Sequence, residues 1–259
     1  MAKLDGTIQF TGSLQNLSAY KMRGSDKLIL RKKGGPTKKQ VKHSPNFELT
    51  RRNNMEFGGR AISAAFIKRV LHPLLFLADH NITAPFNALL RAIQKMDTES
   101  DYGKRHIMLT RQPRLLEGYT LNRTFLFETI VRTPVICHLQ EEEIYIDLPA
   151  LEPGINFMAP GNFAVYKFIA VAGLAPDIYY TEHGYQPGVR DGYFFNHTES
   201  DWLPVNASAP ARRLTLEAPL NKPADCSTVI ALGVAFGVIN GMEIKPVKYV
   251  GAAKVLMMA

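Results

Sequence analysis

The strongest constraint on the fold is a hairpin signal near the C-terminus, in residues 238–244. Asn240 and Gly241 stand there between alternating apolar residues, and Asn-Gly is a pair that tight β-turns favour. Short apolar segments ended by Gly, Pro, Asn or Asp recur throughout the second half of the chain, and residues 143–148 alternate well. This pattern predicts a mainly β (α+β) fold, with an antiparallel β-sandwich over residues 102–259.

Gly and Pro interrupt this part of the chain too often for repeated βαβ units. The apolar patterns instead predict short strands at residues 106–110, 123–131, 135–139, 143–148, 163–173, 213–217, 228–239, 242–248 and 253–257. Since the last of these segments is apolar, we expect the C-terminus to belong to the sheet or to an interface.

Helical spacing of apolar residues characterises residues 47–101, which we expect to form a helical pair. Gly58 and Gly59 interrupt the first pattern, and Pro73 ends it. The second pattern carries an apolar face up to Met96. Ahead of this region, residues 1–46 predict an N-terminal β-hairpin, with one strand near residues 7–10, followed by a basic arm.

Charge is distributed unevenly along the chain. The net charge is +8, yet residues 1–114 contain 21 Lys and Arg against eight Asp and Glu, and residues 115–259 contain 10 against 15. A basic half and an acidic half suggest two surfaces with different partners. The basic half suits nucleic acid, and it equally suits the acidic half of another copy, an arrangement that favours head-to-tail association.

The basic residues concentrate in residues 21–42, which hold nine Lys and Arg and a single acid, Asp26. Because residues 31–46 lack the apolar side chains needed to bury themselves, we expect an extended arm or loop there. This arm could lie across an acidic neighbouring subunit, neutralise phosphates, or remain solvated. The candidate residues for assembly or nucleic-acid binding are Lys21, Arg23, Arg31, Lys32, Lys33, Lys38, Lys39 and Lys42.

Three adjacent acids, Glu141, Glu142 and Glu143, form a candidate acidic docking patch beside a predicted strand. The chain has none of the nucleophile, phosphate-loop or metal-ligand spacings that mark common enzymes, so we predict no catalytic residues, no metal and no cofactor. Cys137 and Cys226 lie in apolar surroundings, which is typical of free thiols.

An aromatic segment, residues 176–202, contains several Asp, Glu and His among Tyr, Phe and Trp residues. It could build a metal or sugar site, with Trp202 as a ligand contact. It could equally be a long loop, at a subunit contact or elsewhere, that its own aromatic side chains hold in place. The missing metal-ligand spacing favours the second interpretation.

Both ends of the chain resemble a family of uncharacterised proteins from Bacteroidota genomes. The resemblance rests on Gly12-x-Leu14-x-x-Leu17-Ser18-x-Tyr20-Lys21, Arg31-x-Lys33-Gly34-Gly35, Pro45-x-Phe47-x-x-x-Arg51-x-Asn53-x-x-Glu56-Phe57-Gly58, Gly233-x-x-Phe236 and Val238-x-Asn240-Gly241. The resemblance implies a bacterial protein of one recurring architecture, and it brings no activity and no catalytic residues.

These features together predict a non-enzymatic structural subunit that self-assembles into a filament, tube or shell. In that hypothesis, residues 4–42 add to a sheet edge or an acidic face of the next copy. The alternative is a nucleic-acid-binding protein that uses residues 21–42. The N-terminus shows no signal peptide and no span of apolar residues crosses a bilayer, so we expect synthesis in the cytoplasm, with a cellular or phage-like particle released by other means.

Overall fold

The computed structural model describes residues 2–4, 10–21, 27–189 and 194–259. The chain forms two compact units, each with more contacts within itself than with the other. Unit 1 is Met1–Arg51, and unit 2 is Arg52–Ala259. Most of the predicted strand at residues 7–10 lies outside the described residues. No helix in the described part of the chain is long and apolar enough to cross a membrane.

Unit 1 contains one small antiparallel sheet with the strand order β1-β4-β3-β2. Its strands are β1 (Ala2–Leu4), β2 (Gly12–Leu14), β3 (Leu17–Lys21) and β4 (Leu28–Lys32). β3 and β4 pair from Leu17↔Lys32 to Lys21↔Leu28, so a hairpin is present where one was predicted. A short helix α1 (Lys38–His43) and a 3-10 turn η1 (Pro45–Phe47) follow the sheet.

The helices that follow are α2 (Glu48–Val70), α3 (Thr83–Met96) and the short α4 (Phe127–Ile130), with 3-10 segments η2 (His72–Leu77) and η3 (Leu109–Arg111). The helical pair is therefore present, and Pro73 falls in η2, directly after α2 ends. Gly58 and Gly59 do not interrupt α2, which continues through both.

The main sheet of unit 2 has the order β10-β7-β13-β14, and all its pairings are antiparallel. It consists of β7 (Val165–Pro176), β10 (Phe195–Glu199), β11 (Leu203–Pro204), β13 (Cys226–Asn240) and β14 (Glu243–Met258). Asn240 pairs with Glu243, so the predicted hairpin is confirmed, with Gly241 and Met242 in the turn. The two predicted C-terminal strands are one long strand, β14.

A second sheet has the order β12-β6-β5, from β5 (Ile136–Leu139), β6 (Glu143–Leu148) and β12 (Arg212–Glu217). A separate hairpin joins β8 (Ile178–Thr181) to β9 (Gly184–Pro187). The prediction of a mainly β, antiparallel fold with a few helices is confirmed.

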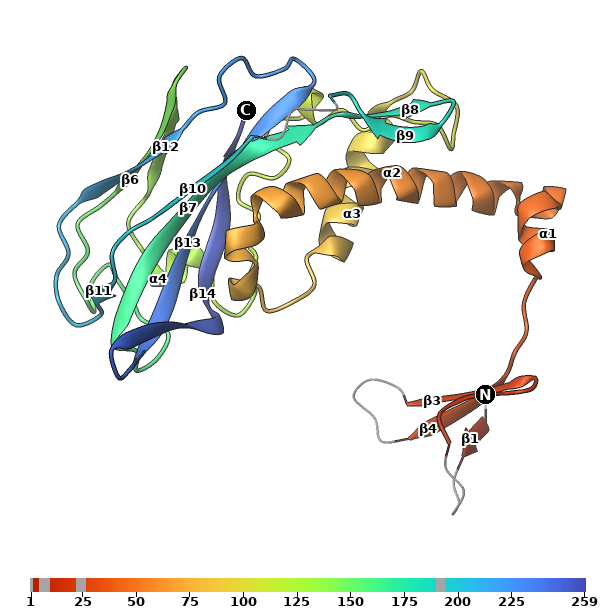
Figure 1. Cartoon of the computed structure of the whole chain (residues 1–259), viewed down its shortest axis with the longest axis horizontal. Coiled ribbons are helices and arrows are strands. Elements are labelled where there is room, and N and C mark those ends of the chain that lie inside the picture. The colour runs from red at the N-terminus through yellow and green to blue at the C-terminus, as the bar shows by residue number, and fades with distance from the viewer. Residues whose placement is uncertain (1, 5–9, 22–26, 190–193) are drawn as a thin grey trace. The chain divides into compact units, whose positions relative to one another are not determined.

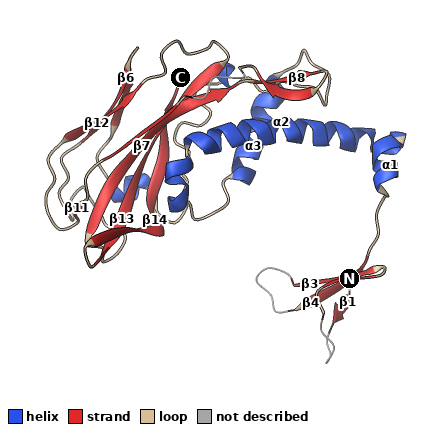
Figure 2. Ribbon diagram, viewed as in Figure 1, coloured by secondary structure: helices blue, strands red, loops and turns tan. Residues whose placement is uncertain are grey.

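The main sheet is covered on both faces (Figures 1 and 2). On one face, Ile169 and Val171 of β7 share a core with helix residues such as Leu74 and Phe86. On the other, Phe168 and Ala170 share a core with β5–β6 and β12 residues such as Ile146. Because successive strand residues point to opposite faces, β7 and β13 read as nearly continuous apolar runs. The helical region and the strands therefore belong to one folded body.

The predicted strand at residues 123–131 is wrong. Asn122 Oδ1 accepts the backbone N–H groups of Thr124 and Phe125, at 2.9 and 2.8 Å. The Asp79 carboxylate accepts the N–H of Arg123 and of Thr124. These side chains take the donors that a strand ladder would use, so the segment turns and continues into α4.

Gly59 marks a close approach between α2 and the β8–β9 hairpin. A Cβ atom added at Gly59 would lie 2.6 Å from Cδ1 of Tyr185, whereas one added at the neighbouring Gly58 would meet no atom within 4 Å. Tyr185 is fixed in that place, because its hydroxyl donates to the backbone oxygen of Arg105 at 3.0 Å and accepts from Gln94 Nε2 at 3.2 Å.

The two glycines therefore give opposite predictions. We expect Gly59→Ala to lower the free energy of unfolding by about 1–3 kcal/mol, because the ring must move. We expect Gly58→Ala to raise it by about 0.5–1 kcal/mol, because alanine favours an exposed helix position. Urea denaturation of the two single variants measures both values, and equal shifts in the two would contradict the contact with Tyr185.

Asp97 ends α3 and organises the loop behind it. The buried carboxylate accepts the backbone N–H of Glu99 at 3.1 Å, of Ser100 at 3.1 Å and of His106 at 2.7 Å. Burial by itself raises the pKa of Asp97, but the hydrogen bonds from His106, Ser100 and Glu99 outweigh it and lower the pKa from 3.8 to about 2.

Since the pKa of Asp97 is lower in the folded state, its contribution to stability is present above pH 4 and disappears as the pH falls through about 2. We expect Asp97→Asn to reduce the free energy of unfolding by about 1–2 kcal/mol at pH 7. The difference from the wild type should shrink between pH 4 and pH 2. Thermal unfolding across this range measures it, with the exposed Asp101→Asn as the control, and a difference independent of pH would refute the assignment.

Candidate functional site: two oppositely charged surfaces

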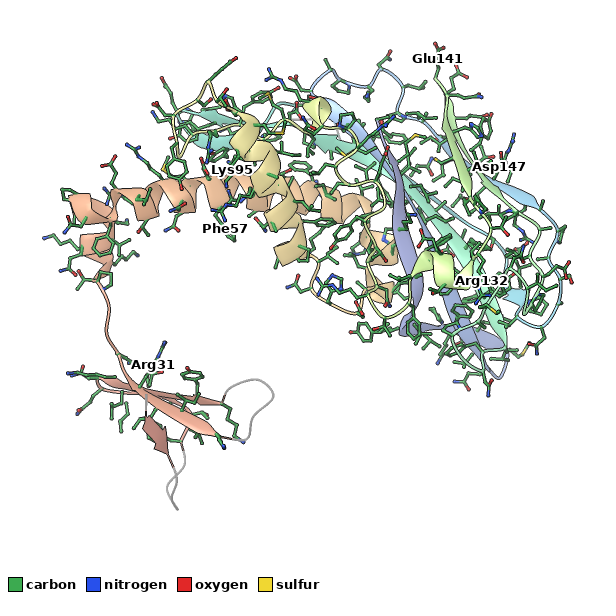
Figure 3. All side chains as sticks on the ribbon, turned by 180° about the vertical axis from the view of Figure 1, so that it is seen from behind. Arg31, Phe57, Lys95, Arg132, Glu141 and Asp147 are labelled. Atoms are coloured by element: carbon green, nitrogen blue, oxygen red, sulfur yellow. The ribbon has the colours of Figure 1, made fainter. Side chains whose placement is uncertain are left out.

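The predicted basic residues that the structure describes are all exposed in unit 1. Lys21 ends β3, and Arg31 and Lys32 end β4. Figure 3 labels Arg31, whose guanidinium carbon lies 5.5 Å from the ring centroid of Tyr20. Lys33 lies beyond β4, and Lys38, Lys39 and Lys42 belong to α1. Arg23 lies outside the described residues.

The extended conformation predicted for residues 31–46 is wrong over α1. Thr37 caps this helix: its hydroxyl accepts the N–H of Gln40 at 3.2 Å, and Gln40 Oε1 accepts the N–H of Thr37 at 2.7 Å. This reciprocal arrangement is a capping box, and its Thr-x-x-Gln pattern is visible in the sequence. Arg51 Nη1 then donates to the backbone oxygens of Val41 and Ser44, both at 2.9 Å.

The sheet of unit 1 has an apolar face that is exposed at one end, at Leu14 and Leu17. The register places Leu14, Leu17 and Ala19 on the same face as Leu28 and Leu30. Among the described side chains of unit 1, Ala19 and Leu28 are the two that are buried, and α1 buries none. Leu14 is 58% exposed.

Unit 1 also carries the whole excess charge of the protein. Residues 1–51 contain 11 Lys and Arg against three Asp and Glu, which gives +8, while residues 52–259 contain 20 of each. Within unit 2, residues 52–114 are also basic, with ten Lys and Arg against five Asp and Glu, and residues 115–259, with 10 against 15, offset that excess.

An acidic groove lies on unit 2 where β6 and β12 pair. It has a volume of about 520 Å³ and is lined by Glu142, Glu143, Phe194, Glu217, Ala218 and Leu220. Glu141 stands at the exposed turn between β5 and β6, where Figure 3 labels it. Glu217 and Phe194 come from segments distant from Glu143 in the sequence, so the sequence alone did not indicate them. The β6–β12 pairing brings Glu217 opposite Glu143.

Two glutamates face each other across this groove. Glu143 and Glu217 are direct cross-strand partners in the β6–β12 ladder, and both are exposed. Farther along the same ladder, Asp147 and Arg213 form a complementary pair, with Arg213 Nε 2.6 Å from Asp147 Oδ1. Like charges at directly opposed positions destabilise a sheet. A positively charged partner over the groove would remove that repulsion.

The aromatic segment at residues 176–202 is largely accounted for by internal contacts. Tyr179 donates to Asp225 at 3.1 Å, and the Tyr180 and Tyr185 rings lie edge to face across the β8–β9 hairpin. The ammonium nitrogen of Lys167 lies 4.9 Å from the centroid of the Trp202 ring, a cation–π contact. Among the described residues, no three His, Cys, Asp or Glu side chains are placed to hold a metal ion.

Both cysteines are free. Cys226 is buried, and Cys137 is half-buried on β5. Burial raises the pKa of Cys137 to about 11, so its thiol is protonated and unreactive at neutral pH.

Comparison with known proteins gave no match to any family model, to any curated protein or to any solved structure. The functional interpretation therefore rests on the geometry of the two charged surfaces.

Proposed function

We propose that the protein is a structural subunit that self-assembles head to tail, with unit 1 of one copy docked on the acidic groove of the next. The observation that carries this proposal is the net charge of +8 on unit 1, beside the exposed apolar side chains of Leu14 and Leu17. We also propose, from the sequence motifs at both ends of the chain, that the protein belongs to the family of uncharacterised Bacteroidota proteins that it resembles.

The apolar face supplies a reason for association. Leu14 and Leu17 are exposed at one end of the apolar face of the unit 1 sheet, whereas Ala19 and Leu28 on the same face are buried. Burying apolar surface stabilises a complex by about 25 cal/mol per Å². β2 also lies at the edge of its sheet, where its unpaired backbone groups can add to another strand.

Charge supplies the direction of association. Unit 1 carries +8, and the acidic groove offers Glu142, Glu143 and Glu217 beside the apolar side chains of Phe194 and Leu220. Leu220 is 69% exposed. An apolar centre with complementary charges around it is the usual composition of a specific interface. Because the two surfaces differ, one copy can engage two neighbours.

Charge reversal tests this arrangement. We expect Lys38→Glu/Lys39→Glu/Lys42→Glu to abolish assembly, and Glu142→Lys/Glu143→Lys/Glu217→Lys to do the same, because each opposes like charges across the contact. An equimolar mixture of the two variants should assemble again, since both of its contacts pair opposite charges. Size-exclusion chromatography with light scattering measures the mass of each sample.

A matched control carries the same change of charge elsewhere. Glu99→Lys/Glu182→Lys/Asp201→Lys alters three exposed acids outside the groove and should assemble as the wild type does. A wild type that remains a monomer would refute self-assembly. If the mixture fails to assemble while both variants stay folded by circular dichroism, the groove is not the docking site.

A second candidate, nucleic-acid binding, draws support from α1. Lys38, Lys39 and Lys42 are exposed on one short helix, and among the described residues none of them forms an ion pair. Tyr20 is the aromatic residue nearest the basic side chains in the sheet, so contacts to phosphate are favoured over stacking on bases.

This candidate predicts binding to single-stranded DNA that weakens steeply with salt. Each phosphate contact contributes a slope of about −0.7 to log K against log salt. The Lys38→Glu/Lys39→Glu/Lys42→Glu variant should bind more weakly and with a smaller slope than Lys222→Glu/Lys245→Glu/Lys248→Glu. Fluorescence anisotropy measures both quantities, and affinity that ignores salt would remove the candidate.

A further inference from the structure

A second charged feature lies wholly within unit 2, in the helical layer. It is a pocket of about 310 Å³ between α2, α3 and the loop that follows α3, and its charged and hydrogen-bonding lining includes Glu56, Arg60, Arg91, Lys95, Tyr102 and Arg105. Figure 3 labels Lys95 and Phe57, which also line it. The pocket thus combines four cationic side chains with one carboxylate.

One side of the pocket is rigid. Glu56 is buried and accepts Arg105 Nε at 2.6 Å and Arg105 Nη2 at 2.8 Å, a two-point ion pair. The N–H of Gly103 donates to the same carboxylate at 3.0 Å. The guanidinium carbon of Arg105 also lies 4.8 Å from the ring centroid of Tyr102, whose hydroxyl donates to Asn53. These contacts neutralise Arg105 and fix the loop.

Arg60 is held at the base of the pocket and is nine-tenths buried, with a residue exposure of 9%. It donates to Gln94 and lies 3.8 Å from Glu56, but its Nε is buried and has no hydrogen-bond partner. Burial lowers the pKa of Arg60, and the charge of Arg91 lowers it further, against the opposing effect of Glu56. Arg60 is therefore a cation whose charge the protein only partly compensates.

The other side of the pocket adds charge without compensation. Arg91 and Lys95 are exposed and lie four residues apart on α3, so they occupy the same helix face. Within the described part of the chain, neither has an ion-pair partner. Like charges at this spacing destabilise a helix by a few tenths of a kcal/mol. Since Arg105 and Arg60 share the single carboxylate of Glu56, the four cations of the cavity exceed its anions by three.

We propose that this pocket binds a small, multiply charged anion of the phosphate class, such as a diphosphate or a phosphate ester. Arginine guanidinium groups match phosphate oxygens with paired hydrogen bonds, and lysine adds a mobile point charge. A cavity of about 310 Å³ is at the lower end of the range for small-molecule sites, roughly 300–1,000 Å³, and is about ten times the volume of a liquid water molecule. It admits a compact ligand and excludes a folded macromolecule.

Isothermal titration of the full chain tests the site, with inorganic pyrophosphate, glucose 6-phosphate and orthophosphate as probes. We expect one pyrophosphate or one glucose 6-phosphate per chain to bind, and which of the two binds more tightly separates a diphosphate from an ester site. Arg91→Gln/Lys95→Gln should weaken binding about tenfold or more, because two charged donors are lost. Both residues are exposed, so the fold should be retained.

The matched control is Lys245→Gln/Lys248→Gln, which removes two exposed cations from β14, outside the pocket. It should leave the affinity within about twofold of the wild type. An equal loss in both double variants would mean that anions respond only to net charge and would overturn the site. So would the absence of binding by every probe. Unit 1 assembly plays no part in these outcomes, so the two proposals fail or succeed separately.

Discussion

Hydrophobic contacts on both faces of β13 are the interaction on which unit 2 depends. The helical layer covers one face, and the β12-β6-β5 sheet covers the other. The helices come close because the sheet has no side chains at two points: added Cβ atoms at Gly173 and Gly233 would lie 2.7 Å from Val70 and 2.6 Å from Leu74. The position of α2 against the sheet in turn determines where Glu56 and Arg60 meet α3 and the loop behind it. The pocket in the helical layer is thus a consequence of how the sheet is packed.

Unit 1 follows a different principle. Unit 2 has abundant buried apolar side chains and no net charge, whereas unit 1 has a net charge of +8 and two buried side chains among those described. In the proposed assembly, a segment of that kind would gain stability from a surface of the next copy. The positive charge of unit 1 would restrict the choice of that surface, because a basic sheet is repelled by other basic surfaces and attracted to acidic ones.

The sequence allowed the strands to be predicted where local chemistry dominates and failed where distant groups intervene. The Asn240-Gly241 hairpin follows from turn preference and alternation, both of which are local. Residues 123–131 are rich in the apolar, aromatic and β-branched residues that favour strands, yet Asp79, more than 40 residues earlier, accepts the backbone N–H groups of Arg123 and Thr124. The capping box at Thr37 was visible in the sequence, but the surrounding lysines obscured it.

The same distinction applies to the functional surfaces. Glu142 and Glu143 were recognisable as a local acidic run, whereas Glu217 joins them only through the β6–β12 register. The pocket in unit 2 was missed altogether. Its residues come from three separate stretches of chain, 53–60, 91–95 and 102–105. Of these residues, Asn53, Glu56 and Phe57 stood out in the sequence only through a family resemblance. No periodicity marks residues that converge from different elements.

The proposed head-to-tail assembly would have a consequence for growth. Each new subunit in a head-to-tail chain uses one surface and leaves the other open, so the two ends of any polymer are chemically different. One end always presents a basic sheet and the other an acidic groove. Such a polymer has an intrinsic polarity, and addition at its two ends proceeds at unequal rates. A capping partner, whether acidic or basic, would therefore stop elongation at one chosen end and leave the opposite end active.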